Sequence, residues 1–454
     1  MIISTSPQRP DDIVVSVPAG TPAEVRAAAE AARKVQPDWL DAGAAARAAA
    51  LGRAADAVQA AAAELTELAV REVGKPLAEA RGEIARSVSI LRYYAQQPFE
   101  EVGAVHSPSG AGLLFTTRRP RGVAGLITPW NFPFAIPLWK AAPALAYGNA
   151  VLLKPAEQAS GCALRLHDLL APVLPAGLFS VLPGDGDTGR AVAEEADVVS
   201  FTGSTAVGRT VVAAAAQRGI PVQAEMGGQN PAIVLPDADL PAAARSIAAA
   251  VAGYAGQKCT ATKRVLVVGD PEPFTEALVA AVRSLVVGDP AREDVSVGPV
   301  IDAAARDRVL AAAESAGPAG GRVLTGGVSA GNAGWFVAPT VVSGLPADHP
   351  LECDEVFGPI CSVNGVASLD EAISRANSVQ QGLVAGLYTR DLGSALAAVH
   401  RLAAGMIKVN APTTGVDFYL PFGGTKASGY GSKEQGKAAA DLYTSVHTVT
   451  VEAG

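Results

Sequence analysis

The stretch VAGLITPWNFPFAIPLWKAAPALAYGNAVLLKPAE, residues 123–157, decides the fold class. Short apolar runs at 123–127 and 150–154 flank a segment of helix length that begins near Phe134. A strand, a helix and a second strand in this order form a βαβ unit, whose two strands lie parallel in one sheet. Continuous Val, Leu and Ile runs are typical of strands that are covered on both faces. The stretch therefore predicts an α/β fold built on a parallel sheet.

The same alternation of strands and helices continues along the chain. Further apolar runs occur in FSVLPG (179–184) and DVVSFTG (197–203), and helices are predicted from Ser160, Thr188 and Ala206. The alternation starts again near Pro231, with strands predicted in NPAIVL, RVLVVG, VAPTVVSG, AGLYTR and GMIKVN. At 454 residues the chain is longer than one hydrophobic core usually supports. We therefore expect at least two domains, of which two are α/β.

The region before residue 123 has different patterns. Residues 21–100 are rich in alanine with periodic Leu, Val and Ile, which indicates helices. Thr21 and Glu24 form the capping-box pattern that begins a helix. Residues 106–122, HSPSGAGLLFTTRRPRG, have the pattern of two strands around Ser-Gly-Ala-Gly. We interpret this last segment as a projecting hairpin.

Composition narrows the class of protein. Hydrophobic residues make up 49% of the chain, which rules out intrinsic disorder, and the net charge of -8 argues against a nucleic-acid partner. No apolar run is long enough to span a membrane, and the N-terminus lacks a signal-peptide pattern. The 4 cysteines show no metal-ligand spacing, and their scarcity fits a reducing compartment. We expect a cytoplasmic protein that needs no metal.

Polar motifs follow several predicted strands, where parallel sheets bind their ligands. In KPAE, Lys154 and Glu157 could contact ribose hydroxyls or could form an exposed ion pair. In FTGS, Gly203 and Ser204 suit either an anion site or a simple N-cap. PGDGDTG contains a Gly-x-Gly-x-x-Gly match at 184–189, but no acid ends the next strand. We interpret that match as a loop near the ligand at most.

Two reactive candidates lie farther along the chain. Cys259, in AGYAGQKCTATKRV (252–265), has small and polar neighbours, and nearby cations predict a lowered thiol pKa. A structural or incidental thiol is the alternative. Glu225, in AEMGGQNP (224–231), could be a general base with a raised pKa or a solvated turn residue. None of the 5 histidines lies in a recognisable motif beside Cys259, so no Cys-His base is visible.

In their order along the chain, these motifs resemble those of the NAD(P)-dependent aldehyde dehydrogenase superfamily. The resemblance spans nearly the whole chain and is carried by PWNFP (129–133), KPAE (154–157), FTGS (201–204), EMGG (225–228), GQKC (256–259), EVFGP (355–359) and PFGGTKASGYG (421–431). It implies that Cys259 attacks an aldehyde to give a thiohemiacetal, and that Asn131 and the Cys259 amide hold the oxyanion. After hydride transfer to nicotinamide, Glu225 would activate the water that hydrolyses the thioester. Glu434, in SKEQG, matches a second glutamate implicated in proton transfer.

The resemblance also implies which residues bind the cofactor. Lys154 and Glu157 would contact the adenosine ribose, and Gly203 and Ser204 the pyrophosphate. Glu355 and Phe357 would position the nicotinamide ribose and ring, with Trp130 as a further contact. We expect NAD to be preferred, with NADP also possible, because a carboxylate at Glu157 would repel a 2′-phosphate.

The fold that the resemblance implies has three parts. They are a Rossmann-type NAD-binding domain (1–105 and 123–227), an α/β catalytic domain (228–429) and a β oligomerisation arm (106–122 and 430–454). The arm would join subunits into a homodimer or homotetramer.

The substrate that the resemblance implies is a small-molecule aldehyde. The segments GQKCTATKR and 413–436 look most like bacterial enzymes for α-ketoglutarate semialdehyde. However, Trp139 and Gly253 occupy positions where succinic semialdehyde enzymes usually carry arginines for the substrate carboxylate. An uncharged or aromatic aldehyde is the alternative substrate. The walls of its binding pocket would then be formed by Trp139, Tyr254, Phe418 and Tyr419. The alternative functions are a cysteine-dependent acyltransferase or hydrolase without a nicotinamide cofactor, and a non-enzymatic scaffold.

Overall fold

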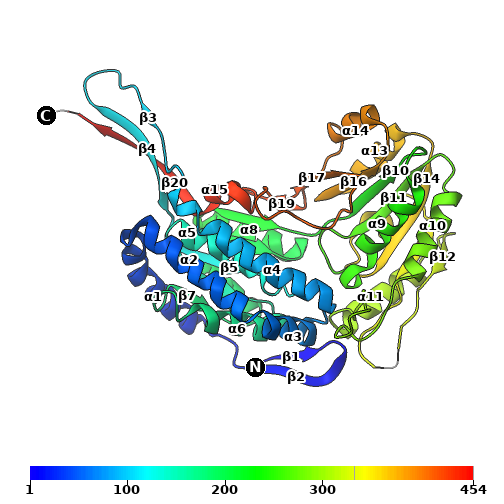
Figure 1. Ribbon diagram of the computed structural model, residues 1–454, viewed down its shortest axis with the longest axis horizontal. Helices are drawn as coiled ribbons and strands as arrows, with labels where there is room; N and C mark the ends of the chain where they lie inside the picture. Colours follow the sequence, from blue (N-terminus) through cyan, green and yellow to red (C-terminus); the bar gives the residue numbers. More distant parts are fainter. Residues whose placement is uncertain (332, 453–454) are drawn as a thin grey trace.

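The computed structural model describes residues 1–331 and 333–452, and two large sheets organise it (Figure 1). The first sheet has the strand order β19-β9-β8-β5-β6-β7. Its strands are β5 (Val123–Ile127), β6 (Ala150–Lys154), β7 (Phe179–Val181), β8 (Val198–Thr202), β9 (Val222–Glu225) and β19 (Gly429–Tyr430). All are parallel except β19, which pairs antiparallel with β9. The predicted α/β fold with a parallel sheet is confirmed.

Helices follow the strands of this sheet as predicted. They are α5 (Ala135–Ala146), α6 (Ser160–Leu170), α7 (Gly186–Glu195) and α8 (Thr205–Arg218), and each begins at or within two residues of its predicted start. The predicted pattern missed β9 and β19. The sequence of β9, VQAE, carries two polar residues in a buried strand and so lacks the apolar run of its neighbours.

Four helices precede the first sheet and pack over it (Figure 1). They are α1 (Pro22–Asp41), α2 (Gly43–Ala60), α3 (Ala62–Val73) and α4 (Leu77–Tyr94). The capping box at the start of α1 is confirmed, because Thr21 and Glu24 bond reciprocally. An N-terminal hairpin of β1 (Ile2–Ser6) and β2 (Arg9–Val17) was not predicted.

The second sheet has the strand order β12-β13-β14-β11-β10-β16-β17. Its strands are β10 (Asn230–Val234), β11 (Thr262–Val268), β12 (Arg322–Thr325), β13 (Thr340–Ser343), β14 (Ile360–Val366), β16 (Val384–Tyr388) and β17 (Met406–Val409). Its helices are α9 (Leu240–Ala252), α10 (Glu272–Arg283), α11 (Ala303–Glu314), α12 (Pro350–Cys353), α13 (Leu369–Asn377) and α14 (Leu392–Val399). The five predicted strands are present. The sequence pattern missed β14, where a serine and an asparagine interrupt the apolar run, and the edge strand β12.

A third, smaller sheet projects from the body (Figure 1). It has the order β20-β4-β3 and consists of β3 (Val105–His106), β4 (Leu113–Pro120) and β20 (Thr444–Val451). The predicted hairpin is therefore present, although β4 pairs mainly with β20, which follows the short helix α15 (Ala439–Tyr443). The remaining strands, β15 (Gln381–Gly382) and β18 (Thr425–Lys426), form a two-stranded ladder.

The chain crosses twice between the two large sheets. The first crossing, residues 226–229, joins β9 directly to β10, and the second returns from β17 to β19. These crossings carry several of the motifs singled out in the sequence, so the motifs meet where the sheets adjoin. In the described part of the chain, no helix combines the length and apolar character needed to cross a membrane.

Candidate active site

Cys259 lies in the short connection between α9 and β11. This connection begins with a 3-10 turn, η3 (Gly253–Gly256), whose last three residues have positive φ angles of 51–65°. A Cβ on Gly256 would lie 2.2 Å from the carbonyl oxygen of Gly358, so glycine is needed where these two loops approach. The carbonyl oxygen of Cys259 accepts a hydrogen bond from Asn230 Nδ2 at 2.7 Å. The backbone of the cysteine is thus fixed while its side chain stays half-buried.

The charges around the thiol differ from the prediction. Lys258 forms an ion pair with Glu79 at 2.7 Å, and Lys263 donates to two backbone carbonyl oxygens. Burial raises the pKa of the Cys259 thiol, and the nearby carboxylates raise this pKa further: Glu355, Glu225 and Glu434. The predicted lowering of the thiol pKa is therefore wrong, because burial and then the three carboxylates disfavour the thiolate. Cys259 keeps its proton until a base removes it.

Asn131 connects the first sheet to the cysteine loop. It follows β5, and its Nδ2 donates to the carbonyl oxygen of Gln257 at 2.9 Å, two residues before Cys259. The side chain is buried, and its Oδ1 has no hydrogen-bond partner among the described residues. Because a side-chain amide carries two N–H groups, one remains available to an oxygen atom bound at Cys259.

Glu225 ends β9 and is 2% exposed. Its Oε2 accepts from the Gly424 N–H at 3.0 Å, and its Oε1 accepts from Gln223 Nε2 at 3.3 Å. Burial raises the pKa of Glu225 well above its ordinary value, and the negative charge of Glu434 adds to this shift. The buried glutamate with a raised pKa is therefore confirmed, and the alternative of a solvated turn residue is wrong.

The segment after Glu225 packs against the cysteine loop. A Cβ on Gly228 would lie 2.9 Å from the Cys259 carbonyl oxygen. A Cβ on Gly227 would lie 1.9 Å from Oε2 of Glu355, so both glycines are needed for these close approaches. The motifs EMGG, GQKC and EVFGP, which are far apart in the sequence, therefore meet at one place.

A buried polar network links Glu225 to Glu434. Lys140 Nζ pairs with Glu434 and also donates to Ser200 Oγ at 2.7 Å. Ser200 Oγ donates to Gln223 Oε1 at 2.7 Å, and Gln223 reaches Glu225 as described above. Burial lowers the pKa of Lys140, while Glu434 opposes this shift. The sequence analysis did not identify Lys140, Ser200 and Gln223 as site residues. The only sequence feature that marks them is their polar character inside an apolar helix or a buried strand.

Glu355 combines burial with an unused acceptor. Burial raises its pKa to about 7, while Lys263 and the Gly228 N–H lower it. Its Oε1 is buried and has no hydrogen-bond partner among the described residues. Two aromatic residues lie in the same area, since Trp130 and Phe357 have ring centroids 5.8 Å apart. A carboxylate oxygen without a partner fits a ligand hydroxyl, such as one on a ribose.

The other predicted cofactor residues lie at the ends of the strands. Lys154 ends β6, and burial lowers its pKa, while Glu157 and then Asp185 oppose this shift. Glu157 begins the 3-10 turn η2 (Glu157–Ala159) that follows. Both side chains therefore start from the carboxyl edge of the first sheet, as predicted for ligand contacts.

The FTGS motif departs in one detail from its predicted role. The N–H of Gly203 donates to the Glu225 carbonyl oxygen at 3.1 Å, so this amide is engaged within the sheet and is not available to a pyrophosphate. A Cβ on Gly203 would lie 2.6 Å from the ring of Phe201, which explains the glycine. Ser204 caps α8, because its Oγ accepts from the Val207 N–H at 3.4 Å.

Two further hydroxyls at the same sheet edge lack partners. Thr128 follows β5 and Thr202 ends β8, and the buried Oγ1 of each has no hydrogen-bond partner within the described part of the chain. These two hydroxyls are therefore free to bond to water or to a ligand at the sheet edge. In the PGDGDTG loop, by contrast, Asp185 accepts from the first amides of α7, so a carboxylate already occupies that helix start.

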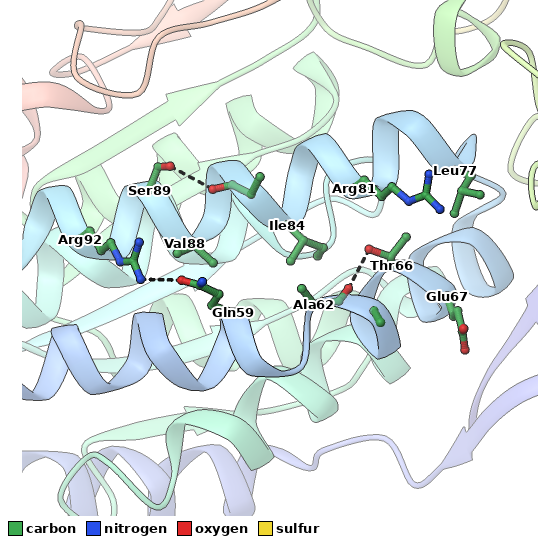
Figure 2. A pocket seen from close by; sticks show the side chains of 12 residues that line it. Gln59, Ala62, Thr66, Glu67, Leu77, Arg81, Ile84, Val88, Ser89 and Arg92 are labelled. Carbon is green, nitrogen blue, oxygen red and sulfur yellow. Dashed lines mark hydrogen bonds between the residues drawn. The ribbon is translucent and has the colours of Figure 1, made fainter. Parts of the chain in front are cut away.

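Hollows of about 520 to 570 Å³ lie elsewhere on the molecule. A groove of about 560 Å³ runs between α2, α3 and α4, and Figure 2 shows Gln59 and Arg92 facing each other across it. None of the predicted site residues lines it. Tyr254, predicted as a pocket wall, is fully buried and donates to the Val73 carbonyl oxygen, so its hydroxyl has a structural partner. The residues described contain no group of three or more His, Cys, Asp or Glu that could hold a metal ion.

Comparison with known proteins agrees with this geometry. Residues 2–449 match the aldehyde dehydrogenase family. The chain is 40% identical to the α-ketoglutaric semialdehyde dehydrogenase of Bacillus subtilis, over 100% of this chain and 95% of that protein. Its fold matches an NAD-dependent aldehyde dehydrogenase from Sinorhizobium meliloti with a TM-score of 0.96, at 36% identity over 100% of this chain and 91% of that one.

A second solved structure includes the cofactor. The betaine aldehyde dehydrogenase of Staphylococcus aureus in complex with NAD+ matches with a TM-score of 0.95, at 28% identity over 99% of this chain and 91% of that one. These comparisons do not favour an acyltransferase or hydrolase that works without nicotinamide. The chain therefore belongs to the aldehyde dehydrogenase family, and it is an enzyme that oxidises an aldehyde with NAD.

Proposed function

We propose that Cys259 is the nucleophile of this oxidation. The observation that carries the proposal is the convergence of two separate segments, one after β5 and one at the start of β10, on the cysteine loop. Asn131 is bonded to Gln257, Asn230 is bonded to the Cys259 carbonyl oxygen, and Gly228 packs against the same oxygen. A loop held this firmly from several sides suits a group that must attack from one fixed position.

The first step is attack by sulfur on the aldehyde carbon. The thiol must lose its proton first, because its pKa is raised, and Glu225 in its ionised form is the nearby base that accepts this proton. The new C–S bond gives a thiohemiacetal whose oxygen carries the negative charge. The second N–H of Asn131 and the Cys259 amide donate to that oxygen and stabilise the charge as it develops.

Glu225 acts again in hydrolysis of the thioester. Its carboxylate takes a proton from the attacking water, and its raised pKa makes this transfer favourable near neutral pH. The Gly424 N–H and Gln223 hold the two carboxylate oxygens in place. Glu434, paired with Lys140, would receive protons from the site through water at its Oε2, which has no partner among the described residues, because the amide of Gln223 cannot relay a proton.

The cofactor residues are proposed from the unsatisfied polar atoms. NAD, when bound, supplies the hydride acceptor. Glu355 Oε1 would accept from a ribose hydroxyl, and Trp130 and Phe357 would flank the ring beside it. Lys154 and Glu157 would hold the adenosine ribose, while the start of α8 at Ser204 would face the pyrophosphate.

The division into parts and the assembly are also proposals. We propose an NAD-binding domain (1–105 and 123–227), a catalytic domain (228–429) and an arm (106–122 and 430–454). Exposed apolar side chains on the arm support a homodimer or homotetramer, since Leu113 is 46% and Val446 60% exposed. A cytoplasmic location is proposed from the scarcity of cysteine.

The test of the nucleophile uses Cys259→Ala with NAD and a panel of aldehydes, followed by NADH absorbance. We expect no NADH from the variant, with cofactor binding and the unfolding transition retained. Cys353→Ala is the matched control, because this half-exposed thiol lies in α12 and should not affect the rate. NADH formation by Cys259→Ala at more than a trace would place the nucleophile elsewhere.

A further inference from the structure

One face of α4 runs alongside the proposed active site. Glu79, Arg86 and Tyr93 recur every seven residues, which places them in one stripe along the helix. Glu79 Oε1 accepts from Lys258 Nζ at 2.8 Å, and Lys258 precedes the proposed nucleophile. At the other end of the stripe, the rings of Tyr93 and Phe418 lie 5.8 Å apart. Both ends of the stripe therefore contact elements of the site.

The loop that contains Phe418 spans the same region. Near its start, Thr413 Oγ1 lies 2.8 Å from Thr262 Oγ1, three residues after Cys259. Near its end, the Gly424 N–H donates to the Glu225 carboxylate. The 413–424 loop and the α4 stripe thus both run from the neighbourhood of Cys259 to the contact between Tyr93 and Phe418. Arg86 lies between those two points.

Arg86 differs from the residues at the two ends of the stripe, which have partners within the described chain. Its side chain is half-buried, yet no hydrogen bond or ion pair of its guanidinium is found among the residues that the structure describes. Burial lowers the pKa of this guanidinium, and Asp417 and then Glu83 oppose that shift. A guanidinium carries five N–H donors, and burying them without acceptors is unfavourable.

The other arginines of the same helix are different. Arg81 pairs with Glu293 at 2.8 Å, and Arg92 donates to Gln59 Oε1. Both line the groove between α2, α3 and α4 on the opposite side of the helix, as Figure 2 shows. Among the arginines of α4, the absence of a protein partner within the described residues is therefore particular to Arg86, and its guanidinium is free to bind a ligand.

We propose that Arg86 binds the carboxylate of the aldehyde substrate, so that the enzyme prefers semialdehydes of short dicarboxylic acids. Arginine is suited to this role, because its planar fork matches a carboxylate with two parallel hydrogen bonds. Two helical turns, about 10 Å, separate Arg86 from Glu79 beside the cysteine loop, which a short carbon chain and the arginine side chain together can span. Arg86 on α4 thus supplies the cation for the substrate carboxylate, whereas the positions of the usual arginines are occupied by Trp139 and Gly253.

This proposal rests on the aldehyde oxidation proposed for Cys259. It predicts different rates for aldehydes with a negative and with a positive charge. The related enzymes include one named for α-ketoglutaric semialdehyde, which carries a carboxylate, and one named for betaine aldehyde, which carries a positive charge. An unpaired arginine attracts the first and repels the second. The site of this chain is therefore selective for an anionic tail.

The experiment compares succinic semialdehyde with butanal, which has the same chain length and no charge, and with betaine aldehyde. The measured quantity is the ratio of kcat/KM for succinic semialdehyde to that for butanal. We expect Arg86→Met to lower this ratio by about 10- to 100-fold, the range for one charged hydrogen-bonded contact, and Arg86→Lys to restore part of it. Arg92→Met is the matched control and should leave the ratio unchanged.

Inhibition by glutarate gives a second readout that does not depend on turnover of a charged aldehyde. Glutarate should compete with butanal in the wild type and lose this effect in Arg86→Met. Oxidation of butanal with no preference for succinic semialdehyde, or an unchanged ratio in Arg86→Met, would overturn the role of Arg86 and leave aldehyde oxidation standing. Absence of NADH formation from all three aldehydes would overturn both proposals.

Discussion

At the residue scale, the two groups proposed for proton transfer both hold their protons more tightly than usual. Burial raises the pKa values of Cys259 and Glu225, and each group acts in its deprotonated form. A group with a raised pKa becomes deprotonated only as pH rises through that value. We therefore predict that kcat/KM increases as pH rises through and above neutrality, and the measurement is a pH profile with a saturating cofactor concentration.

Glu225→Gln is the control for this profile. The amide keeps the shape of the side chain but cannot accept a proton from water, so thioester hydrolysis should become very slow. Deprotonation of the thiol should also become slower, so the expected record is a slow burst of NADH followed by a still lower steady rate. A wild-type profile that falls across the same pH range would contradict the assignment of Glu225 as base.

Also at the residue scale, Glu157 sets the expected cofactor preference. A carboxylate beside the adenosine ribose accepts from both hydroxyls, whereas a 2′-phosphate would bring like charges together. We predict an NAD preference of about 1–3 kcal/mol, or roughly 5- to 150-fold in kcat/KM, since Lys154 offsets part of the repulsion. Glu157→Ser should shrink the preference. Equal use of NAD and NADP by the wild type would contradict it.

At the scale of elements, a buried ion pair joins α4 to the start of α5. Lys75 and Glu83 are both 0% exposed and pair with each other. Glu83 Oε1 also accepts from the backbone N–H groups of Phe134 and Ala135, each at 2.9 Å. Lys75 Nζ lies 3.8 Å from the centre of the Phe132 ring, next to Asn131. The pair therefore orients the turn that carries the proposed oxyanion donor.

We predict that Lys75→Met destabilises the protein strongly, because it leaves the Glu83 charge buried without a partner. The expected loss is about 3–5 kcal/mol, measured from the first unfolding transition in urea. Lys75→Met combined with Glu83→Gln should lose less than the sum of the two single changes. Strict additivity of the two losses would show that the charges do not interact.

The elements also show how far sequence patterns reach. Apolar runs predict β5, β6 and β8, because these strands are buried on both faces and most of their residues are apolar. The same rule misses β9, which must carry Gln223 and Glu225 for the site. The pKa of the Cys259 thiol was also mispredicted. The position of a lysine beside a cysteine in the sequence does not show which carboxylate the lysine pairs with, and Lys258 pairs with Glu79 on α4.

At the scale of the whole molecule, the projecting sheet leaves β20 at an edge. An edge strand with exposed apolar side chains is a ready surface for pairing with a second chain. We predict that deleting the chain from His447 onward lowers the oligomeric state, as measured by light scattering coupled to gel filtration. A monomeric wild-type protein would contradict the proposed assembly.

The position of Glu434 also has a consequence for how the chain folds. Three partners of the C-terminal segment lie hundreds of residues earlier: Tyr94 bonds to the Gly436 carbonyl oxygen, and Lys140 and Ser200 bond to Glu434. The last strand of the first sheet, β19, comes from this segment as well. The N-terminal half therefore cannot complete its core during synthesis on the ribosome. Folding to the native state waits until residues 429–436 have been synthesised, and contacts of such long sequence separation make that final step slow.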